Sequence, residues 1–296
     1  MSHEHNRIAH TFSQRDKMAR LKDKVCIITG ATSGIGKRTA EIFAAEGAKL
    51  VIAGRREAEG EAVAKSIGVS CDFIRTDVTV EAQMKTLIDF AMRKHGRIDC
   101  LFNNAGGPAP VGGIEGIPVD GFDQAMAVLV RSVMLGMKHA APVMQQQRSG
   151  SIINNGSVAA HRAGLSSSMV YAAAKAAVVH LTRCVAMQLG ESGVRVNSIS
   201  PGGIATGIFG KALGLPTDKA EQTAEAVKAG LAKMQPIPRT GLTDDIALAA
   251  VFLASDEASF VNGHDLVVDG GLIGGRQWSQ QQEGLRGMKR AFGIEG

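Results

Sequence analysis

The segment TGATSGIG, residues 29–36, decides the fold of this 296-residue chain, because it joins a short apolar run to a helical pattern. In such a strand–turn–helix, Gly30 permits a sharp turn, Gly34 lets the backbone approach a phosphate, and Gly36 lets the helix pack closely on the strand. The first helical turn offers free N–H groups and a partial positive charge to an anion. A tight loop without a ligand has a similar composition, but the position after the first strand favours a dinucleotide-binding turn.

Short runs of apolar and β-branched residues alternate with longer helical patterns along the chain. The predicted strands are Lys24–Thr29, Lys49–Ala53, Val69–Arg75, Ile98–Asn103, Ser151–Asn155, Arg195–Ser200 and Asp265–Val268. The predicted helices are Ile35–Glu46, Glu57–Ser66, Glu81–His95, Asp120–Gln147 and Tyr171–Glu191. Most of the strands are apolar on both faces, as parallel strands between two helical layers are. The order predicts the α/β class, with one Rossmann-like, doubly wound parallel sheet of about seven strands.

The length suits a single domain, which we assign to residues 21–271. Residues 1–20 are polar and predict a flexible leader without the apolar stretch of a secretory signal. The stretch 202–238 is rich first in glycine and then in Ala, Lys and Glu, which predicts a mobile helical insertion acting as a substrate lid. Residues 272–296 form a C-terminal tail without a strand pattern. No run of about 18 apolar residues predicts a membrane span.

Composition argues against several classes of partner. The net charge is +5, but the basic residues are spread out and aromatic residues make up only 4%, so we expect no nucleic-acid partner. The four cysteines lie in separate apolar segments, without the spacing of metal ligands. They predict buried, reduced thiols in a cytoplasmic protein that holds no metal. The cysteines are Cys26, Cys71, Cys100 and Cys184.

Tyr171 and Lys175 lie four residues apart at the start of a predicted helix, so they share one face. A free tyrosine has a pKa of about 10 and is a weak base at neutral pH. A nearby ammonium favours the phenolate and would lower the pKa of Tyr171 toward a useful value. The spacing Tyr-x-x-x-Lys arises often by chance, but Tyr171 is the only tyrosine and follows Ser157 by fourteen residues.

These features together resemble the short-chain dehydrogenase/reductase (SDR) superfamily, in the branch with Gly-x-x-x-Gly-x-Gly and Tyr-x-x-x-Lys. The resemblance includes Asn103-Asn104-Ala105-Gly106 and Ser157, and it extends from about Leu21 to Gly271. It implies hydride transfer between a nicotinamide ring and an alcohol or ketone carbon. The glycine spacing differs from Gly-x-x-Gly-x-x-Gly of the sugar-nucleotide-modifying branch, which argues against an epimerase.

The resemblance also implies roles for individual residues. Tyr171 would exchange the proton, Ser157 would bind the substrate oxygen, and Lys175 would also bind the nicotinamide ribose. The cofactor-binding residues would be Gly30, Thr32, Ser33, Gly34, Ile35, Gly36, Arg55, Asp77, Val78, Asn104, Ala105, Gly106, Tyr171, Lys175, Ile204 and Thr206. Asp77 or Thr79 is also suited to the N-cap of the following helix. Four apolar residues, which favour a hydrophobic or cyclic substrate, would line the substrate side: Val158, Leu165, Ile208 and Phe209.

The residues after the second strand, Gly54-Arg55-Arg56, bear on the choice of cofactor. A carboxylate here would bind a ribose 2′-hydroxyl, whereas Arg55 is suited to a bidentate grip on a 2′-phosphate. The sequence therefore favours NADP over NAD, although a solvated charged loop would look the same. Ser33 stands where some NADP-using relatives carry a basic residue.

Leu129 departs from the family pattern, because relatives usually carry a catalytic asparagine at this position. In relatives that asparagine supports a kink whose backbone carbonyl holds a water in contact with the active-site lysine. Leucine has no side-chain hydrogen bonds to offer. Either the backbone carbonyl still holds the water, or Ser132, one turn on, takes over.

The sequence thus predicts an NAD(P)-dependent oxidoreductase of a secondary alcohol or ketone. Two alternatives are a 3-oxoacyl thioester reductase and, in a different class, a low-turnover dinucleotide-binding sensor or scaffold. By resemblance we expect a homotetramer, paired through the two long helical segments and the last strand. Trp278 would anchor the tail against a neighbouring subunit or over the substrate, unless the tail is a frayed end.

Overall fold

The structure, a computed structural model, describes residues 19–294. Residues 1–18 of the predicted leader therefore lie outside the described residues. Arg20 is held in place, because its guanidinium pairs with the carboxylate of Glu46 at the end of the first helix (Nη2–Oε1 2.5 Å). The folded domain thus begins before Leu21.

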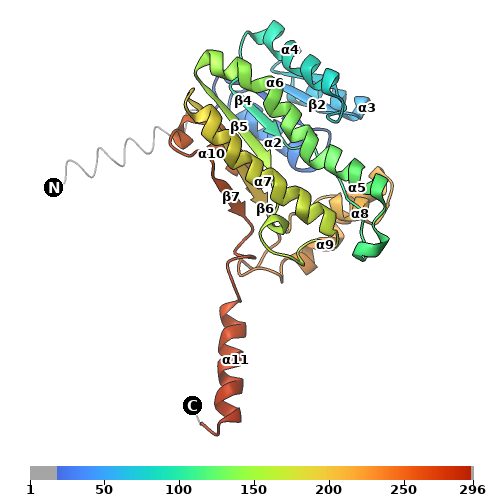
Figure 1. The fold of residues 1–296 in the computed structure, drawn as a ribbon, viewed down its shortest axis with the longest axis vertical. Coiled ribbons are helices and arrows are strands. Elements are labelled where there is room, and N and C mark those ends of the chain that lie inside the picture. Colours follow the sequence, from blue (N-terminus) through green and yellow to red (C-terminus); the bar gives the residue numbers. More distant parts are fainter. Residues whose placement is uncertain (1–18, 295–296) are drawn as a thin grey trace, which may run out of the picture.

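Seven parallel strands form one sheet in the order β3-β2-β1-β4-β5-β6-β7 (Figure 1). They are β1 Val25–Thr29, β2 Lys49–Gly54, β3 Cys71–Arg75, β4 Cys100–Asn103, β5 Gly150–Asn155, β6 Val194–Pro201 and β7 Asp265–Val268. The predicted doubly wound sheet is confirmed, and no strand end differs from its prediction by more than two residues. The direction of winding reverses between β1 and β4, which is where open α/β sheets bind ligands.

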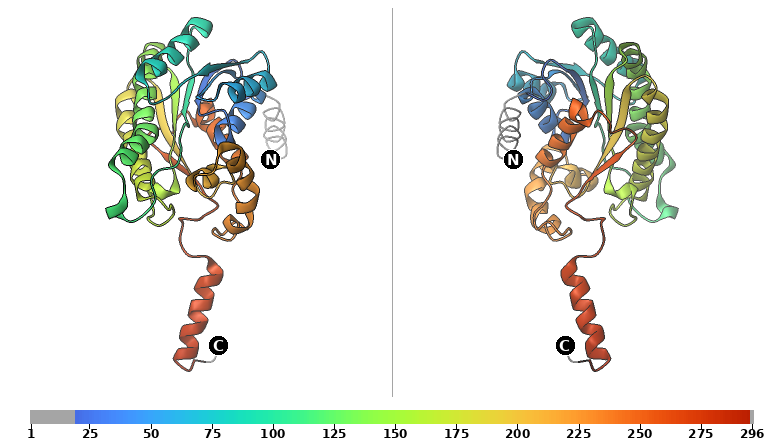
Figure 2. Two further views of the ribbon diagram at one scale, coloured as in Figure 1. Left: turned by 90° about the vertical axis from the view of Figure 1, so that its right-hand side faces the viewer. Right: turned by 90° about the vertical axis from the view of Figure 1, so that its left-hand side faces the viewer.

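Helices cover both faces of the sheet (Figure 2). One face carries α2 (Gly34–Ala45), α3 (Glu57–Ile67) and α10 (Thr243–Ala254). The other face carries α4 (Glu81–His95), α6 (Ser132–Gln147) and α7 (Met169–Gly190). Alternate residues of β1 enter the two cores, since Ile28 packs with Phe43 of α2 while Ile27 packs with Met84 of α4. This two-sided burial explains why the strands are apolar on both faces.

The sequence pattern misses α10 as a helix. Its segment from Ile246 to Ala254 is apolar almost all round, so it shows no amphipathic period. The helix packs closely on α2 and is covered by the sheet, which is the environment that such a composition requires. Asp244 and Asp245 in its first turn are the local signal that marks its start.

The remaining elements lie around the carboxyl edge of the sheet and beyond it, except η4, which lies at the amino edge, where Asp256 pairs with Lys24. The predicted insertion contains α8 and α9, and the tail contains α11, a helix that the sequence pattern does not predict. These elements are η1 (Ile114–Gly116), α5 (Val119–Met126), η2 (Ala127–Arg131), η3 (Val158–Ala160), α8 (Ile208–Ala212), α9 (Thr217–Leu231), η4 (Asp256–Ala258) and α11 (Trp278–Ala291).

By length and composition alone, α7 would suit a membrane span, with a mean hydropathy of 1.2. Its inner residues, among them Val178 and Ala186, instead pack against the sheet in the core. Its outer face leaves Cys184 and Met187 exposed. The prediction of four buried cysteines is therefore wrong for Cys184, because that position faces outward on the helix.

Candidate active site

A cavity of about 560 Å³ opens at the carboxyl ends of the strands, beside the switch point between β1 and β4. Every residue that the sequence assigns to catalysis, cofactor or substrate lines this one cavity. The individual roles of these residues stay predictions, but segments as distant as Gly30 and Phe209 meet here. The volume lies within the usual range for cofactor and ligand sites.

The glycine-rich turn has the backbone that an anion site requires. Gly30 has φ +68°, and a Cβ on Gly36 would lie 2.4 Å from the Gly30 carbonyl oxygen, so both positions need glycine. The N-cap of α2, Ser33, makes no side-chain capping bond, and the first turn carries no acidic residue. The first N–H groups of α2 therefore remain available to a phosphate.

Asn104 locks three strand ends together at the floor of the cavity. Its amide donates to the Thr29 carbonyl (2.9 Å), and its Oδ1 accepts from the Asn155 amide (3.0 Å). The hydroxyl of Thr29 in turn accepts from the backbone N–H of Ala105 (3.0 Å). The Asn-Asn-Ala-Gly segment thus fixes the backbone beside the glycine turn. The side chain of Asn104 makes its hydrogen bonds to other residues of the protein.

Ser168 places Tyr171 by capping α7. Its hydroxyl accepts from the backbone N–H of Tyr171 (3.1 Å) and donates to the Pro110 carbonyl (2.5 Å). The helix therefore begins two residues before Tyr171, at Met169, and the tyrosine lies in its first turn. Ser168 is not among the predicted site residues, although a serine just before an apolar helix is an N-cap signal.

Lys175 lies one turn deeper, where it is almost fully buried. Its Nζ donates to the backbone carbonyl of Asn155 at the end of β5 (2.6 Å) and lies 5.6 Å from the centroid of the Tyr171 ring. Burial lowers the pKa of this ammonium to about 8. The cavity therefore holds a lysine whose charge depends on pH near neutrality.

The pKa of Tyr171 corrects one expectation. Burial is the largest influence and raises the pKa above its usual value, while a hydrogen bond with Ser157 partly lowers it. The sequence predicts that the Lys175 ammonium lowers the pKa of Tyr171. This prediction is wrong for the protein without a bound ligand, because burial raises the pKa by more than any such effect lowers it. Tyr171 is consequently a protonated phenol at neutral pH, a state suited to donating a proton to a carbonyl oxygen.

Replacing Lys175 with methionine should change how stability depends on pH. The unfolded lysine keeps its proton up to its usual pKa of 10.5, whereas the folded one loses it near 8. Between pH 8 and pH 10 the unfolded chain binds more protons, so the free energy of unfolding of the parent rises with pH. We expect the free energy of unfolding of the parent to rise by roughly 2 kcal/mol relative to that of Lys175→Met between pH 8 and pH 10, since one pKa unit corresponds to about 1.4 kcal/mol. Urea unfolding at several pH values measures it.

Tyr171→Phe is the matched control for this measurement. The unfolded tyrosine titrates at 10 and the folded one above it, so Tyr171 contributes less than about 0.5 kcal/mol within the window and the variant should keep nearly all of the pH dependence of the parent. Parallel stability curves for the parent and Lys175→Met would contradict the depressed lysine pKa.

The predicted long helix over Asp120–Gln147 is divided by a π-helical turn, η2, that contains Leu129. Leu129 is buried, lines the cavity, and packs toward Gly106. The hydroxyl of Ser132 donates to the Val128 carbonyl (2.6 Å) and does not line the cavity. A π-helical turn therefore forms at this position without the asparagine. The hydroxyl of Ser132 is used within the helix itself, which argues against a part for it in a proton relay.

Two arginines lie beyond the end of β2, on the side of the cavity opposite Tyr171. Arg56, which is not among the predicted site residues, donates through Nη2 to the hydroxyls of Thr32 (2.7 Å) and Ser33 (2.9 Å). Arg55 is exposed toward the cavity and close enough to Asp77 to help lower its pKa. The two guanidinium groups and the α2 N-terminus therefore present positive charge to one part of the cavity.

Asp77 forms a local turn and is not a helix cap. Its Oδ1 accepts from the backbone N–H (2.9 Å) and the hydroxyl (2.7 Å) of Thr79, whereas α4 begins after Val80. Burial raises its pKa, but the bonds from Thr79 and the charge of Arg55 lower it more, and the net pKa is below its usual value. Asp77 thus faces the cavity as a carboxylate.

The opposite end of the cavity is mainly apolar. The predicted substrate residues line it, and Val111, Leu231 and Met234 join them from loops and from α9. An ion pair between Lys211 and Glu221 (2.6 Å) connects α8 to α9 at the rim. The place of these residues in the cavity wall cannot be predicted from local sequence, because they reach the cavity only when the insertion folds over the sheet.

Comparisons with known proteins agree with this geometry. The family described as enoyl-(acyl carrier protein) reductase matches residues 30–273. Tropinone reductase-like 2 of Erythroxylum coca is 42% identical over 257 residues, which cover 85% of this chain and 91% of the relative. (+)-Borneol dehydrogenase 2 of Salvia officinalis is 39% identical over 271 residues, which cover 89% and 94%. The crystal structure of levodione reductase matches with a TM-score of 0.78 and 34% identity, covering 86% of this chain and 99% of that one.

The chain belongs to the short-chain dehydrogenase/reductase family. It is an NAD(P)-dependent oxidoreductase that interconverts a secondary alcohol and a ketone.

Proposed function

We propose that this enzyme acts on a cyclic ketone and the matching secondary alcohol, with NADP as its preferred cofactor. The observation that carries the substrate class is the apolar wall facing Ser157 and Tyr171. A rigid apolar ring fills such a space with little loss of conformational entropy. The names of the relatives, which refer to tropinone, borneol and levodione, support the same class.

The residues divide the chemistry as follows. When bound, the nicotinamide supplies or accepts the hydride. In the direction of reduction, Tyr171 donates its phenolic proton to the carbonyl oxygen, and Ser157 donates a hydrogen bond to the same oxygen. Lys175 is positioned to hold the nicotinamide ribose from its place beside Asn155. In oxidation the proton moves back from the alcohol to Tyr171.

A substrate panel followed by nicotinamide absorbance tests the proposal. We expect bicyclic and monocyclic ketones to be reduced with a kcat/KM at least about tenfold above that of acyclic ketones of equal carbon number, because burial of a preorganised ring costs less entropy. A preference for 3-oxoacyl thioesters would replace the proposal with the alternative reductase. Tight cofactor binding without turnover on any substrate would favour a sensor or scaffold.

The cofactor preference rests on the region after β2. Gly54 leaves no carboxylate to repel a 2′-phosphate, and Arg55 and Arg56 both line the cavity there. Arg56 is fixed by Thr32 and Ser33, so its guanidinium is oriented before any ligand binds. Preorganised arginine is well suited to a phosphate dianion.

An aspartate at position 54 should move the preference toward NAD, but Gly54→Asp alone is poorly designed. A Cβ at Gly54 would lie 2.6 Å from the methyl group of Thr32, so the matched variant is Gly54→Asp with Thr32→Ser. We expect the NADPH/NADH ratio of kcat/KM to fall by about 100-fold, since the carboxylate repels the phosphate and accepts from a ribose hydroxyl. Thr32→Ser by itself is the control. A parent enzyme that already prefers NADH would contradict the proposal.

We also infer a cytoplasmic homotetramer. The exposed Cys184 and Met187 on α7 and Met134 on α6 give these helices an outer face suited to pairing across a two-fold axis. Strand β7 lies at the edge of the sheet, where backbone groups remain available to a neighbour. The four free cysteines are typical of a reducing compartment.

A further inference from the structure

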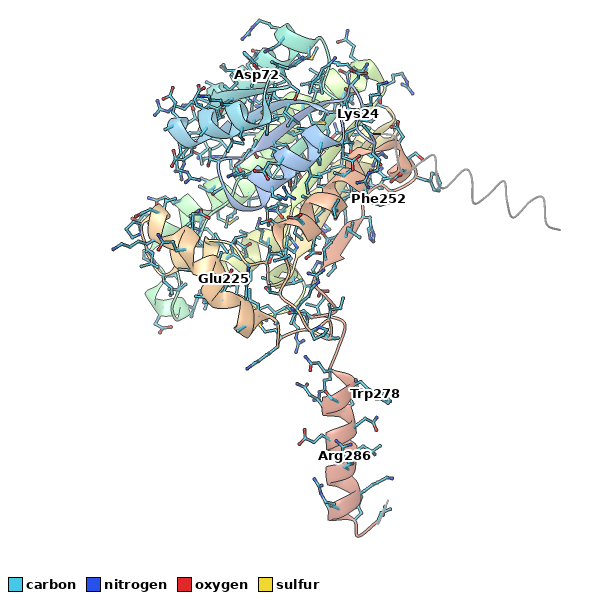
Figure 3. The ribbon with its side chains drawn as sticks, turned by 180° about the vertical axis from the view of Figure 1, so that it is seen from behind. Lys24, Asp72, Glu225, Phe252, Trp278 and Arg286 are labelled. Carbon is cyan, nitrogen blue, oxygen red and sulfur yellow. The ribbon has the colours of Figure 1, made fainter. Side chains whose placement is uncertain are left out.

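Helix α11 stands apart from the folded body (Figure 1). None of its residues is buried, and within residues 19–294 no ion pair joins it to the body, to which only its N-cap residue Gln277 donates a hydrogen bond, at the Lys233 carbonyl (3.3 Å). Figure 3 shows Trp278 and Arg286 projecting from it without a neighbouring element. The frayed end considered from the sequence is thus a helix in the structure, and it lacks a partner among residues 19–294.

The helix is amphipathic. Trp278, Leu285, Met288 and Phe292 follow one stripe at spacings of seven, three and four residues, and all four side chains are exposed. Three basic residues flank this stripe or lie on the opposite side of the helix: Arg286, Lys289 and Arg290. The helix has only one acidic residue, Glu283.

An isolated helix of 14 residues is marginal in water, and the two internal glycines weaken it further. Helix α11 therefore needs a surface that covers its apolar stripe and complements its charge.

A complementary surface lies on the same chain, over residues 111–123, and we call it the acidic face. Its apolar side chains, all exposed, are Val111, Ile114, Val119 and Phe122. Its carboxylates, also exposed, are Glu115, Asp120 and Asp123. Within residues 19–294, neither these carboxylates nor the three basic residues of α11 take part in an ion pair.

We propose that α11 of one copy docks on the acidic face of a second copy. The stripe would cover the exposed apolar side chains while Arg286, Lys289 and Arg290 pair with the carboxylates. The contact forms between copies because α11 points away from the body and from α5, as two views show (Figures 1 and 2). The proposal rests on the proposed assembly only in that a second copy is needed.

Docking in this position would complete the substrate site. Val111 belongs both to the acidic face and to the cavity wall. An α11 seated beside it would stand at the mouth of the cavity of the other copy, with its apolar stripe toward the substrate side. The affinity for an apolar substrate should then fall when α11 is removed.

Disulfide trapping between differently tagged copies of the full chain tests the contact. One copy carries Val119→Cys and the other Leu285→Cys, both with Cys184→Ser to remove the exposed native thiol. We expect a heterodimer to form under mild oxidation. Val69→Cys, at an exposed apolar residue that follows α3, is the matched control for Val119→Cys and should give at least about tenfold less product. Equal yields from the two would overturn the proposal.

Charge reversal tests the specificity of the same disulfide. Arg286→Glu with Arg290→Glu should lower the yield, and Asp120→Arg with Asp123→Arg on the other copy should restore it. The reversal Lys65→Glu with Arg93→Glu, at exposed positions on α3 and α4, changes the net charge equally and should leave the yield unchanged. A disulfide yield that stays the same in the variant with Arg286→Glu and Arg290→Glu would also overturn the proposal.

Two further readouts distinguish docking between copies from tetramer formation alone and from binding to a membrane. Light scattering of the parent reports the tetramer by itself: a tetramer without the specific disulfide overturns the docking alone. A charge-dependent disulfide supports the docking whatever the mass. A basic amphipathic helix also suits an anionic membrane. Binding to phosphatidylserine vesicles that needs Arg286 and Arg290, with no disulfide between copies, would replace the partner copy with a lipid surface.

Discussion

Replacing Tyr171 with phenylalanine should lower kcat by about two to four orders of magnitude, the range typical for loss of a positioned general acid or base. Tyr171 carries an exchangeable proton and lies beside Ser157. The centroid of its ring lies 5.6 Å from Nζ of Lys175. Phenylalanine keeps the ring and its packing but removes the exchangeable proton. Steady-state turnover on the best cyclic ketone measures the effect.

The affinity for the cofactor is the internal control for Tyr171→Phe. The glycine turn and the arginines lie on the other side of the cavity, so the NADPH dissociation constant should change by less than about threefold, corresponding to less than about 0.7 kcal/mol. Turnover near that of the parent would show that another group transfers the proton. A large loss of NADPH affinity would mean that the variant disturbs the cavity as a whole.

Replacing Ser157 with alanine should lower kcat/KM by about 100- to 1000-fold, as loss of one donor to a developing oxyanion does. The interaction with Ser157 is also what lowers the pKa of Tyr171 against the effect of burial. Without it the pKa of Tyr171 rises further, so at a given pH a smaller fraction of the tyrosine is ionised and able to accept the proton of the alcohol. The acid limb of alcohol oxidation should therefore shift to higher pH.

Ser167→Ala is the matched control, because Ser167 lines the same cavity and its side chain makes no hydrogen bond with any of residues 19–294. It should keep both the rate and the pH profile of the parent. A Ser157→Ala enzyme with a lower rate but an unshifted pH profile would separate substrate binding from the tuning of Tyr171. That outcome would contradict the second part of the prediction.

Much of the site can be predicted from the sequence because its signals are local. The glycine turn, the Tyr-x-x-x-Lys spacing and the strand runs each lie within a few residues, and backbone geometry turns such spacing into placement. Parallel strands then bring their carboxyl ends to one edge of the sheet. This is why residues from Gly30 to Phe209 line one cavity, as the sequence requires.

Other residues could not be assigned in this way. Helix α10 has no amphipathic period, because the sheet and α2 surround it. Arg56 looks like any charged loop residue until the fold brings it to Thr32 and Ser33. Ser132 looks like a replacement for the missing asparagine until its hydroxyl is seen to bond the helix backbone.

The sequence by itself determined the class of fold, the strand order along the chain and the identity of the candidate reacting groups, since these follow from local pattern and spacing. Only the tertiary structure decided the protonation of those groups. Burial raises the pKa of Tyr171 and lowers that of Lys175 to about 8, and burial depends on every segment that packs around the cavity. Within the described residues, 19–294, the tertiary structure also leaves α11 without a partner, because a helix covers its apolar stripe only where another surface matches it.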